Sequence, residues 1–237
     1  METICHHFLN VRNRKNKIAV EYVHQKKWTS VTWAEYYDLV EKFGCGLIRL
    51  GIEPGEKVII FSNTRLEWAI ADMAILGLGA VTVPIYQSSI PEEILFIVQN
   101  SEAKTIIFES QEVYKRYQKV AGSITNIKNL IGINFSAENI QSFQEILEMG
   151  DNYRKDHPNF FEQSCLNTDS EDLATIVYTS GTTGTPKGVC LHHEQIISEV
   201  TEVFDRVYAD ATDKTLTFLP YAHVFGRFEL WAHVYMG

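Results

Sequence analysis

Residues 57–86 read KVIIFSNTRLEWAIADMAILGLGAVTVPIY and carry the pattern that sets the fold class. Lys57–Phe61 is an apolar, β-branched run, which is typical of a strand buried on both faces of a parallel sheet. Helical spacing of apolar residues follows at about 64–78, and a second short apolar run follows at about 80–84. This order of elements predicts a strand, a helix and a second strand that lies parallel to the first.

The same alternation continues on both sides of this stretch. Upstream, residues 18–33 predict a small hairpin, and Trp33–Leu50 has the spacing of a helix that Gly51 closes. Downstream, helices are predicted from Pro91 to about Asn100, at about 110–121 and at about 141–149, and strands at 104–108 and 129–133. Strands that alternate with helices in this way predict an α/β fold with a largely parallel sheet.

A polar segment at 150–172 is predicted to be a connection, and a new unit follows it. Strands are predicted at Leu173–Tyr178, Gly188–Leu191 and Thr215–Leu219, and helices at about 192–208 and Phe225–Tyr235. We therefore expect two subdomain-like units, at about 1–165 and 166–237.

Composition excludes several classes of protein. The chain has 237 residues, of which 45% are hydrophobic, and 30 acidic against 21 basic residues give a net charge of −9. Such a chain has enough apolar residues for a core, and its acidity argues against a nucleic-acid partner or a polybasic membrane patch. No signal peptide is recognisable at the N-terminus, and four cysteines without a CxxC pair suggest free thiols. We therefore expect a cytoplasmic protein.

No metal site is expected. His192–Glu194 matches the H-x-E part of a zinc deaminase motif, but the chain contains no PCxxC, and Cys5–His7 has no partner cluster. The histidines at 192 and 193 are therefore expected at the surface or at a helix start. Trp28 and Trp33 are expected in the core rather than in a stacking platform for nucleic acid.

The strongest chemical signal is Tyr178–Val189, which reads YTSGTTGTPKGV. Six of its first eight residues bear hydroxyls, its glycines let the backbone approach a ligand closely, and Lys187 supplies one cation. Amide and hydroxyl donors with a lysine suit a polyphosphate. A bare GTTG string is typical of a solvated loop, but the whole string after a buried strand favours binding. It is no Walker A motif, because a strand rather than a helix is predicted after Lys187 and no hydroxyl follows it.

This loop resembles the signature loop of the AMP-forming adenylating superfamily. That superfamily includes acyl-CoA synthetases, firefly-luciferase-like enzymes and peptide-synthetase adenylation domains. Residues 50–86 resemble its N-terminal region, and Leu219–Arg227 (LPYAHVFGR) resembles a segment of long-chain fatty-acid–CoA ligases. The resemblance implies an adenylating-enzyme N-terminal domain, with largely parallel sheets flanked by helices, that residues 1–237 contain only in part. The C-terminal lid domain is expected to be absent.

The resemblance also implies a reaction in two steps. A carboxylate attacks the α-phosphate of Mg²⁺-bound ATP to give acyl-AMP and pyrophosphate, and the thiol of coenzyme A then displaces AMP. By the motif match, the β- and γ-phosphates would be held by Thr179, Ser180, Gly181, Thr182, Thr183, Gly184 and Lys187. Lys187 would meet the departing pyrophosphate.

A second catalytic candidate comes from the LPYAHVFGR segment. The resemblance places His223 beside the acyl pocket, where it would orient the carboxylate or gate its entry; a hydrogen-bonded structural histidine is the alternative. Tyr221, Val224 and Phe225 would line the acyl channel or belong to the core. Arg227 would meet an anion or be a solvated helix residue.

The function that the resemblance favours is a long-chain fatty-acid–CoA ligase, with fatty acid, ATP and coenzyme A as small-molecule partners. Peripheral membrane contact through the lipid substrate is left open. The alternatives are an aryl or amino-acid adenylating enzyme and a non-catalytic nucleotide-binding remnant. The family's adenine-side, ribose-side and lid motifs are not found in residues 189–237, so we expect the chain alone to be inactive.

Overall fold

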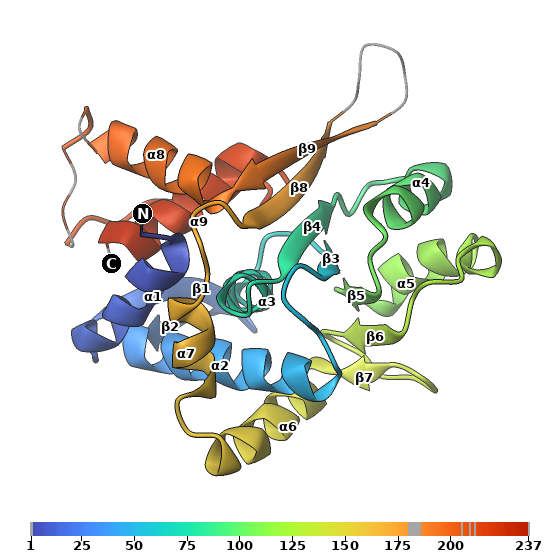
Figure 1. The fold of residues 1–237 in the computed structure, drawn as a ribbon, viewed down its shortest axis with the longest axis horizontal. Coiled ribbons are helices and arrows are strands. Elements are labelled where there is room, and N and C mark those ends of the chain that lie inside the picture. The colour runs from blue at the N-terminus through green and yellow to red at the C-terminus, as the bar shows by residue number, and fades with distance from the viewer. Residues whose placement is uncertain (1, 180–185, 205, 209, 211, 237) are drawn as a thin grey trace.

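A computed structural model describes residues 2–179, 186–204, 206–208, 210 and 212–236. Its centre is a seven-stranded sheet with the order β7-β6-β5-β3-β4-β8-β9 (Figure 1). All neighbours in the sheet run parallel except β8 and β9, as the largely parallel prediction requires. The strands are β3 Lys57–Phe61, β4 Val81–Ile85, β5 Thr105–Phe108, β6 Asn129–Gly132, β7 Gln141–Ser142, β8 Leu173–Thr179 and β9 Lys187–His192.

Helices cover both faces of this sheet (Figure 1). The larger core lies under α1 Ile4–Val11, α2 Trp33–Arg49, α3 Leu66–Gly77, α6 Phe143–Asp156, α7 Phe160–Leu166, α8 His193–Phe204 and α9 Val224–Met236. The smaller core lies under α4 Pro91–Ser101 and α5 Gln111–Gln118. Alternate residues of β3 enter the two cores, Val58 the larger and Ile59 the smaller, so both faces of this strand are buried. Its continuous apolar sequence follows from that position.

Helix α2 shows how local sequence sets an element. Thr32 and Glu35 form a reciprocal capping box at its start, and Gly51 follows its end with a φ of +81°. Helix α2 packs against α6 where Gly46 of α2 meets Gly150 of α6. A Cβ on Gly150 would lie 1.7 Å from the carbonyl oxygen of Lys42. The two helices therefore meet backbone to backbone.

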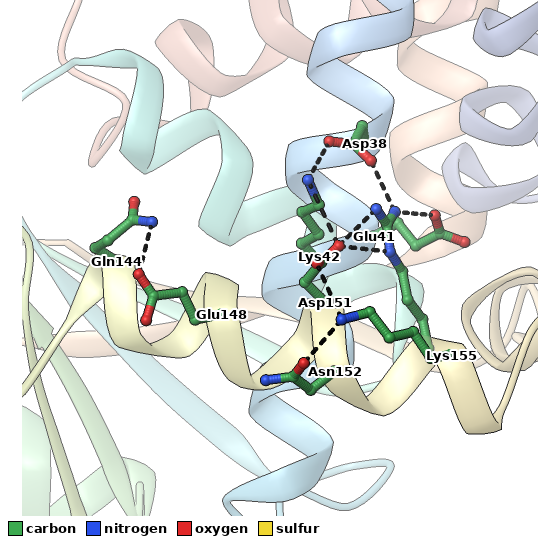
Figure 2. A network of polar contacts seen from close by, with 9 residues as sticks. Asp38, Glu41, Lys42, Gln144, Glu148, Asp151, Asn152 and Lys155 are labelled. Atoms are coloured by element: carbon green, nitrogen blue, oxygen red, sulfur yellow. Dashed lines mark hydrogen bonds and ion pairs between the residues drawn. The ribbon is translucent and has the colours of Figure 1, made fainter.

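Charged side chains surround this helix contact (Figure 2). Arg154 of α6 donates to Asp38 at 2.7 Å, to Glu41 at 3.0 Å and to Asp151 at 2.7 Å. Lys42 of α2 adds an ion pair to Asp38 at 2.7 Å. Because these side chains are partly exposed, water competes for each of their contacts.

The predicted hairpin is present as a two-stranded sheet of β1 Ile18–His24 and β2 Lys27–Thr32. The prediction of Trp33 in the core is confirmed, since it is 5% exposed. The prediction for Trp28 is wrong, because its ring is 71% exposed opposite Val23. The hairpin has its own two-stranded sheet, so its outer face has no second layer to bury that ring.

The predicted connection at 150–172 is also wrong. Helix α6 extends to Asp156, and α7 occupies residues 160–166. Phe161 and Cys165 of α7 are fully buried, and the ring of Phe161 fills the space that side chains at Gly44 and Gly77 would need. A helix of seven residues is too short to show the helical spacing of apolar residues clearly. The polar composition of the segment therefore led to the prediction of a connection.

The strand predicted at Thr215–Leu219 is not formed in the described chain. Its alternation is nevertheless real, since the hydroxyls of Thr215 and Thr217 donate to Glu229 of α9 while Leu216 and Phe218 are exposed. The strand prediction is wrong here because a strand also needs a neighbour with which to form a ladder.

The remaining predictions concern the end of α8 and the large-scale organisation. Helix α8 ends at Phe204 rather than near 208. Among the described residues, no helix is long and apolar enough to cross a membrane. Strands β8 and β9 continue the sheet formed by β3–β7, and the division into units near residue 165 stays a prediction.

Candidate functional site

The β8–β9 hairpin holds the two ends of the predicted phosphate loop. Thr179 is the last residue of β8 and lies opposite Lys187, the first residue of β9, and both are exposed. The predicted residues Ser180, Gly181, Thr182, Thr183 and Gly184 lie outside the described residues. The structure therefore fixes where the loop leaves and rejoins the sheet.

The hairpin is held by an aromatic ring that lies over a glycine. Tyr178 is paired with Gly188, and a Cβ on Gly188 would lie 2.9 Å from Cγ2 of Ile176 and 3.2 Å from Cζ of Tyr178. The hydroxyl of Tyr178 donates to Oδ1 of Asn100 at 2.7 Å, and burial raises the pKa of this phenol to about 12. Gly188 is thus needed for cross-strand packing, in addition to the close approach to a ligand for which the glycines of this motif were singled out.

The LPYAH segment lies at the same edge of the sheet as the loop ends. Strands β3, β4 and β8 are parallel, so their carboxyl ends share one edge. Thr64, in the loop that follows β3, donates its hydroxyl to the carbonyl oxygen of Leu219 at 3.1 Å and accepts the N–H of Tyr221 at 2.9 Å. Ligands of parallel α/β sheets bind outside this edge. The fold thus brings both sequence motifs to the edge where a ligand is expected.

His223 occupies the turn between this segment and α9. Its N–H donates to the carbonyl of Pro220 at 2.9 Å, and its Nδ1 accepts the N–H of Phe225 at 3.2 Å. Because Nδ1 is an acceptor, the neutral ring carries its proton on Nε2. A Cβ on Gly226 would lie 2.4 Å from the oxygen of Pro220, so the turn packs tightly against the first turn of α9. The exposed ring therefore presents an N–H donor from a well-defined backbone.

The apolar neighbours of His223 divide into two kinds. Tyr221 is partly buried, with its ring centroid 5.1 Å from that of Trp68. Val224 and Phe225 are 38% and 62% exposed. They are not core residues in the described chain, and they give the surface beside His223 an apolar character.

Arg227 is the residue whose role the sequence did not reveal. It is fully buried, and its Nη2 donates to Oδ1 of Asp72 in α3 at 2.6 Å, while its Nη1 donates to the hydroxyl of Thr175 in β8. The expectation of a solvated helix residue is wrong. One signal was present: Asp72 is the only charged residue in the apolar stretch 68–85, and a buried carboxylate needs a partner.

The expectation of a helix start is confirmed for His193, the first residue of α8, and His192 directly precedes it. His192 is half-buried, and its Nδ1 lies 2.6 Å from the carbonyl oxygen of Glu171. His193, however, is fully buried at the start of α8, and this burial lowers its pKa to about 4. Ile196 and Ile197, three and four residues later in α8, lie on the same face of the helix and belong to the larger core.

Cysteines and acidic residues give no second site in the described chain. Cys5, Cys45 and Cys165 are buried free thiols, as expected, whereas Cys190 on β9 is exposed. No group of three or more His, Cys, Asp or Glu side chains among the described residues is placed to hold a metal ion.

The sequence of this chain is similar to known proteins over most of its length. Residues 8–237 match the model of the AMP-binding enzyme family. The long-chain-fatty-acid–CoA ligase FadD15 of Mycobacterium bovis is 36% identical over 202 residues, which cover 84% of this chain and 33% of that protein. The chain thus spans about a third of the length of this curated relative.

Solved structures share the fold. A long-chain-fatty-acid–CoA ligase from Archaeoglobus fulgidus superposes with a TM-score of 0.82 at 20% identity, over 98% of this chain and 45% of its own. The anthranilate–CoA ligase AuaEII, solved with anthranoyl-AMP, gives a TM-score of 0.85 at 22% identity, over 99% of this chain and 43% of its own. With the family match across nearly the whole sequence, the conclusion is direct: the chain belongs to the AMP-binding enzyme family.

Proposed function

We propose that this chain forms the phosphate- and carboxylate-facing part of a long-chain fatty-acid–CoA ligase that forms AMP. The observation that carries the proposal is the position of the two motifs. The ends of the YTSGTTGTPKGV loop and the LPYAH segment lie at the carboxyl edge of one parallel sheet. A triphosphate and a carboxylate must meet in this way for the carboxylate oxygen to attack the α-phosphorus.

Loop residues 179–184 and Lys187 would bind the β- and γ-phosphates. Attack of the carboxylate forms the acyl–phosphate bond and breaks the bond to the pyrophosphate oxygen, so negative charge builds on the leaving group. An ammonium at position 187, together with backbone amides and hydroxyls, stabilises that charge where it develops. Thr179 and Lys187 support this role, because both are exposed and face each other where the loop leaves the sheet.

His223 would orient the acid. The acceptor role of its Nδ1 leaves the Nε2–H to donate to a carboxylate oxygen, which holds the other oxygen toward the nucleotide. The exposed side chains of Val224 and Phe225 supply the apolar surface that an acyl chain would contact.

The family relationship implies Mg²⁺ with ATP, and coenzyme A as the second acceptor. Magnesium prefers oxygen ligands, chiefly carboxylates and phosphates. Among the described residues, no group of three or more His, Cys, Asp or Glu side chains is placed to hold a metal ion, so none of them is assigned to Mg²⁺. Coenzyme A would act in the second step, in which its thiolate displaces AMP from the acyl carbon.

An aryl or amino-acid adenylating enzyme is the second candidate. It is favoured by the strong fold similarity to AuaEII, whose bound ligand is an aryl adenylate. The LPYAHVFGR string and the 36% identity to a long-chain ligase favour a fatty acid instead. A non-catalytic nucleotide-binding remnant is the third candidate.

ATP–pyrophosphate exchange tests these candidates. The product of the intact gene is assayed with saturated fatty acids of increasing length, with benzoate and anthranilate, and with amino acids. Exchange that depends on long fatty acids supports the proposal, exchange with aryl or amino acids alone selects the second candidate, and no exchange with any acid contradicts both. The isolated chain of 237 residues, assayed beside it, is expected to form no acyl-CoA. Acyl-CoA made by this chain alone would contradict that expectation.

We further propose that the protein acts in the cytoplasm, with a lipid-derived acid reaching it by peripheral contact with a membrane. The exposed apolar residues beside His223 support the membrane contact. Flotation of the purified protein with anionic and neutral vesicles, with and without fatty acid, tests it, and no flotation under any condition contradicts membrane contact.

A further inference from the structure

The first turn of α9 contains a charged side chain that water does not reach. Arg227 and Asp72 are each 0% exposed, and Nη2 of Arg227 lies 2.6 Å from Oδ1 of Asp72. Its Nη1 donates to Oγ1 of Thr175, and that hydroxyl donates to the carbonyl of Thr82 at 2.6 Å. Thr82 and Thr175 form the backbone pair that joins β4 to β8. One guanidinium therefore links α9 to α3 and to the sheet.

Two indole rings enclose the guanidinium. Its Cζ lies 4.5 Å from the ring centroid of Trp231 in α9 and 5.4 Å from that of Trp68 in α3. A planar guanidinium can lie over aromatic rings and donate to two partners at once, whereas a lysine ammonium is a point charge. The pocket is thus built for arginine.

Arg227 also connects the two parts of the candidate site, which are the His223 turn and the end of β8. Its backbone N–H donates to the carbonyl oxygen of His223 at 3.2 Å. Its side chain holds Thr175, four residues before Thr179 at the end of β8. Any shift of this side chain therefore changes the position of the His223 turn relative to the start of the phosphate loop.

Stability alone does not explain the pair. Burial lowers the pKa of Arg227, and the charge of Asp72 opposes this effect. Within the described chain, Oδ2 of Asp72 and Nε of Arg227 have no hydrogen-bond partner. Apolar residues of similar volume often replace such a pair without loss of stability. What the pair adds is one defined arrangement of the elements that it joins.

We propose that Arg227 is a positioning residue that holds the His223 turn in register with the end of β8, with Asp72 and Thr175 as its fixed points. The effect of this positioning on catalysis rests on the proposed function, but the positioning itself does not.

The distance between two spin labels measures the register directly. One label goes on the native Cys190 of β9, which is exposed, and the other on a Phe225→Cys substitution at the start of α9, which is 62% exposed. Cys5, Cys45 and Cys165 are buried, and burial raises the pKa of Cys5 and Cys45 to about 12, so they resist labelling. Double electron–electron resonance on this chain should give one narrow distance distribution.

The decisive variant is Asp72→Leu/Arg227→Met, which removes both charges and keeps the volume. We expect it to retain the urea midpoint of the labelled parent and to broaden the distance distribution. Arg227→Lys keeps the charge but loses the fork, and should broaden the distribution as well; it decides the question if the double variant does not fold. Arg154→Ala, which removes exposed charge pairs, is the control and should change nothing. A narrow, unshifted distribution in Arg227→Lys or in a folded double variant would overturn the proposal.

Exchange assays on the intact gene product separate this inference from the proposed function. A misplaced group costs up to about a hundredfold in rate, so Arg227→Lys should lower kcat by about tenfold or more. The KM for ATP should change little, because the loop itself is intact. Broadened distances without any exchange activity in the parent would leave the register standing and contradict the function. Exchange with unchanged kcat in Arg227→Lys would contradict the register's role.

Discussion

Two sets of charged side chains fasten helices in this chain, and they differ in how much water reaches them. Between α2 and α6, Arg154 contacts the carboxylates of Asp38, Glu41 and Asp151, and its side chain is 26% exposed. Between α3 and α9, Arg227 meets Asp72 with neither side chain exposed. Both sets are ion pairs between an arginine and carboxylates, but water reaches the first set and does not reach the second.

The difference shows what each set contributes. At α2 and α6 the close packing of Gly46 and Gly150 already fixes the helices, and the charges lie around that contact. At α3 and α9 the charges themselves make the contact, inside a low-dielectric core. The exposed network therefore adds a small stabilisation, whereas the buried pair sets a geometry and is costly to disturb.

The largest expected effect comes from breaking the buried pair on one side. Asp72→Ala leaves the Arg227 guanidinium buried and unpaired, which should lower the free energy of unfolding by about 3–5 kcal/mol. Urea denaturation followed by tryptophan fluorescence measures it. A loss below about 1 kcal/mol, the range of an exposed pair, would remove the distinction between the two regions.

The buried region also predicts how stability changes with pH. His193 has a folded-state pKa of about 4, lowered mainly by burial. Its unfolded-state pKa is about 6.5, so the unfolded chain takes up the proton first and stability falls as the pH drops from about 6.5 to 4. The loss should reach about 3 kcal/mol at pH 4. In His193→Gln the part of the slope due to this residue should disappear, while His192→Gln should keep it; equal slopes in all three proteins would contradict the assignment.

Packing rather than charge should dominate at the exposed contact. Gly150→Ala places a Cβ 1.7 Å from the Lys42 carbonyl, and a backbone atom cannot move away as a flexible side chain would. We expect a loss of about 1–3 kcal/mol in urea denaturation. Gly122→Ala is the matched control, because a Cβ there meets nothing within 4 Å. Similar midpoints for the two variants would show that α2 and α6 can separate freely.

The smallest effect is expected from the exposed charges. Arg154→Ala should cost about 1 kcal/mol or less, and the cost should shrink in 1 M salt (about 3 Å screening length), because water and ions already screen these pairs. A double-mutant cycle with Asp38→Ala isolates the pair from the rest of the network. A coupling energy as large as that of the buried pair would contradict the comparison.

The sequence predicted the parallel sheet well because its signals are local. Lys57–Phe61 matches β3 residue for residue, and the helix predicted from Trp33 begins at Trp33 as α2. The YTSGTTGTPKGV loop pointed to Lys187 and the family resemblance pointed to His223, and the topology brings their segments to one edge of the sheet. The sequence did not show that Gly188 pairs closely with Tyr178, because this is a contact across strands.

What the sequence did not reveal depends on distant partners. Arg227 and Asp72 are 155 residues apart, and no local pattern connects them. Helix α7 is buried by Phe161 and Cys165, but its polar residues and short length hid that face. At Thr215–Leu219 the sequence predicted a strand. Whether a strand forms depends on a neighbouring strand that pairs with it, and such a neighbour comes from another part of the chain.

The central claim is that the loop bounded by Thr179 and Lys187 binds phosphates, and pyrophosphate titration tests it most directly. Isothermal titration calorimetry compares the chain with Lys187→Ala and with Lys104→Ala, a lysine just before β5 at the opposite edge of the sheet. A charge-assisted contact is worth about 1.5–3 kcal/mol, so Lys187→Ala should raise the Kd by about tenfold to a hundredfold. Lys104→Ala should leave it unchanged. Equal affinities in the parent chain and Lys187→Ala would contradict the claim.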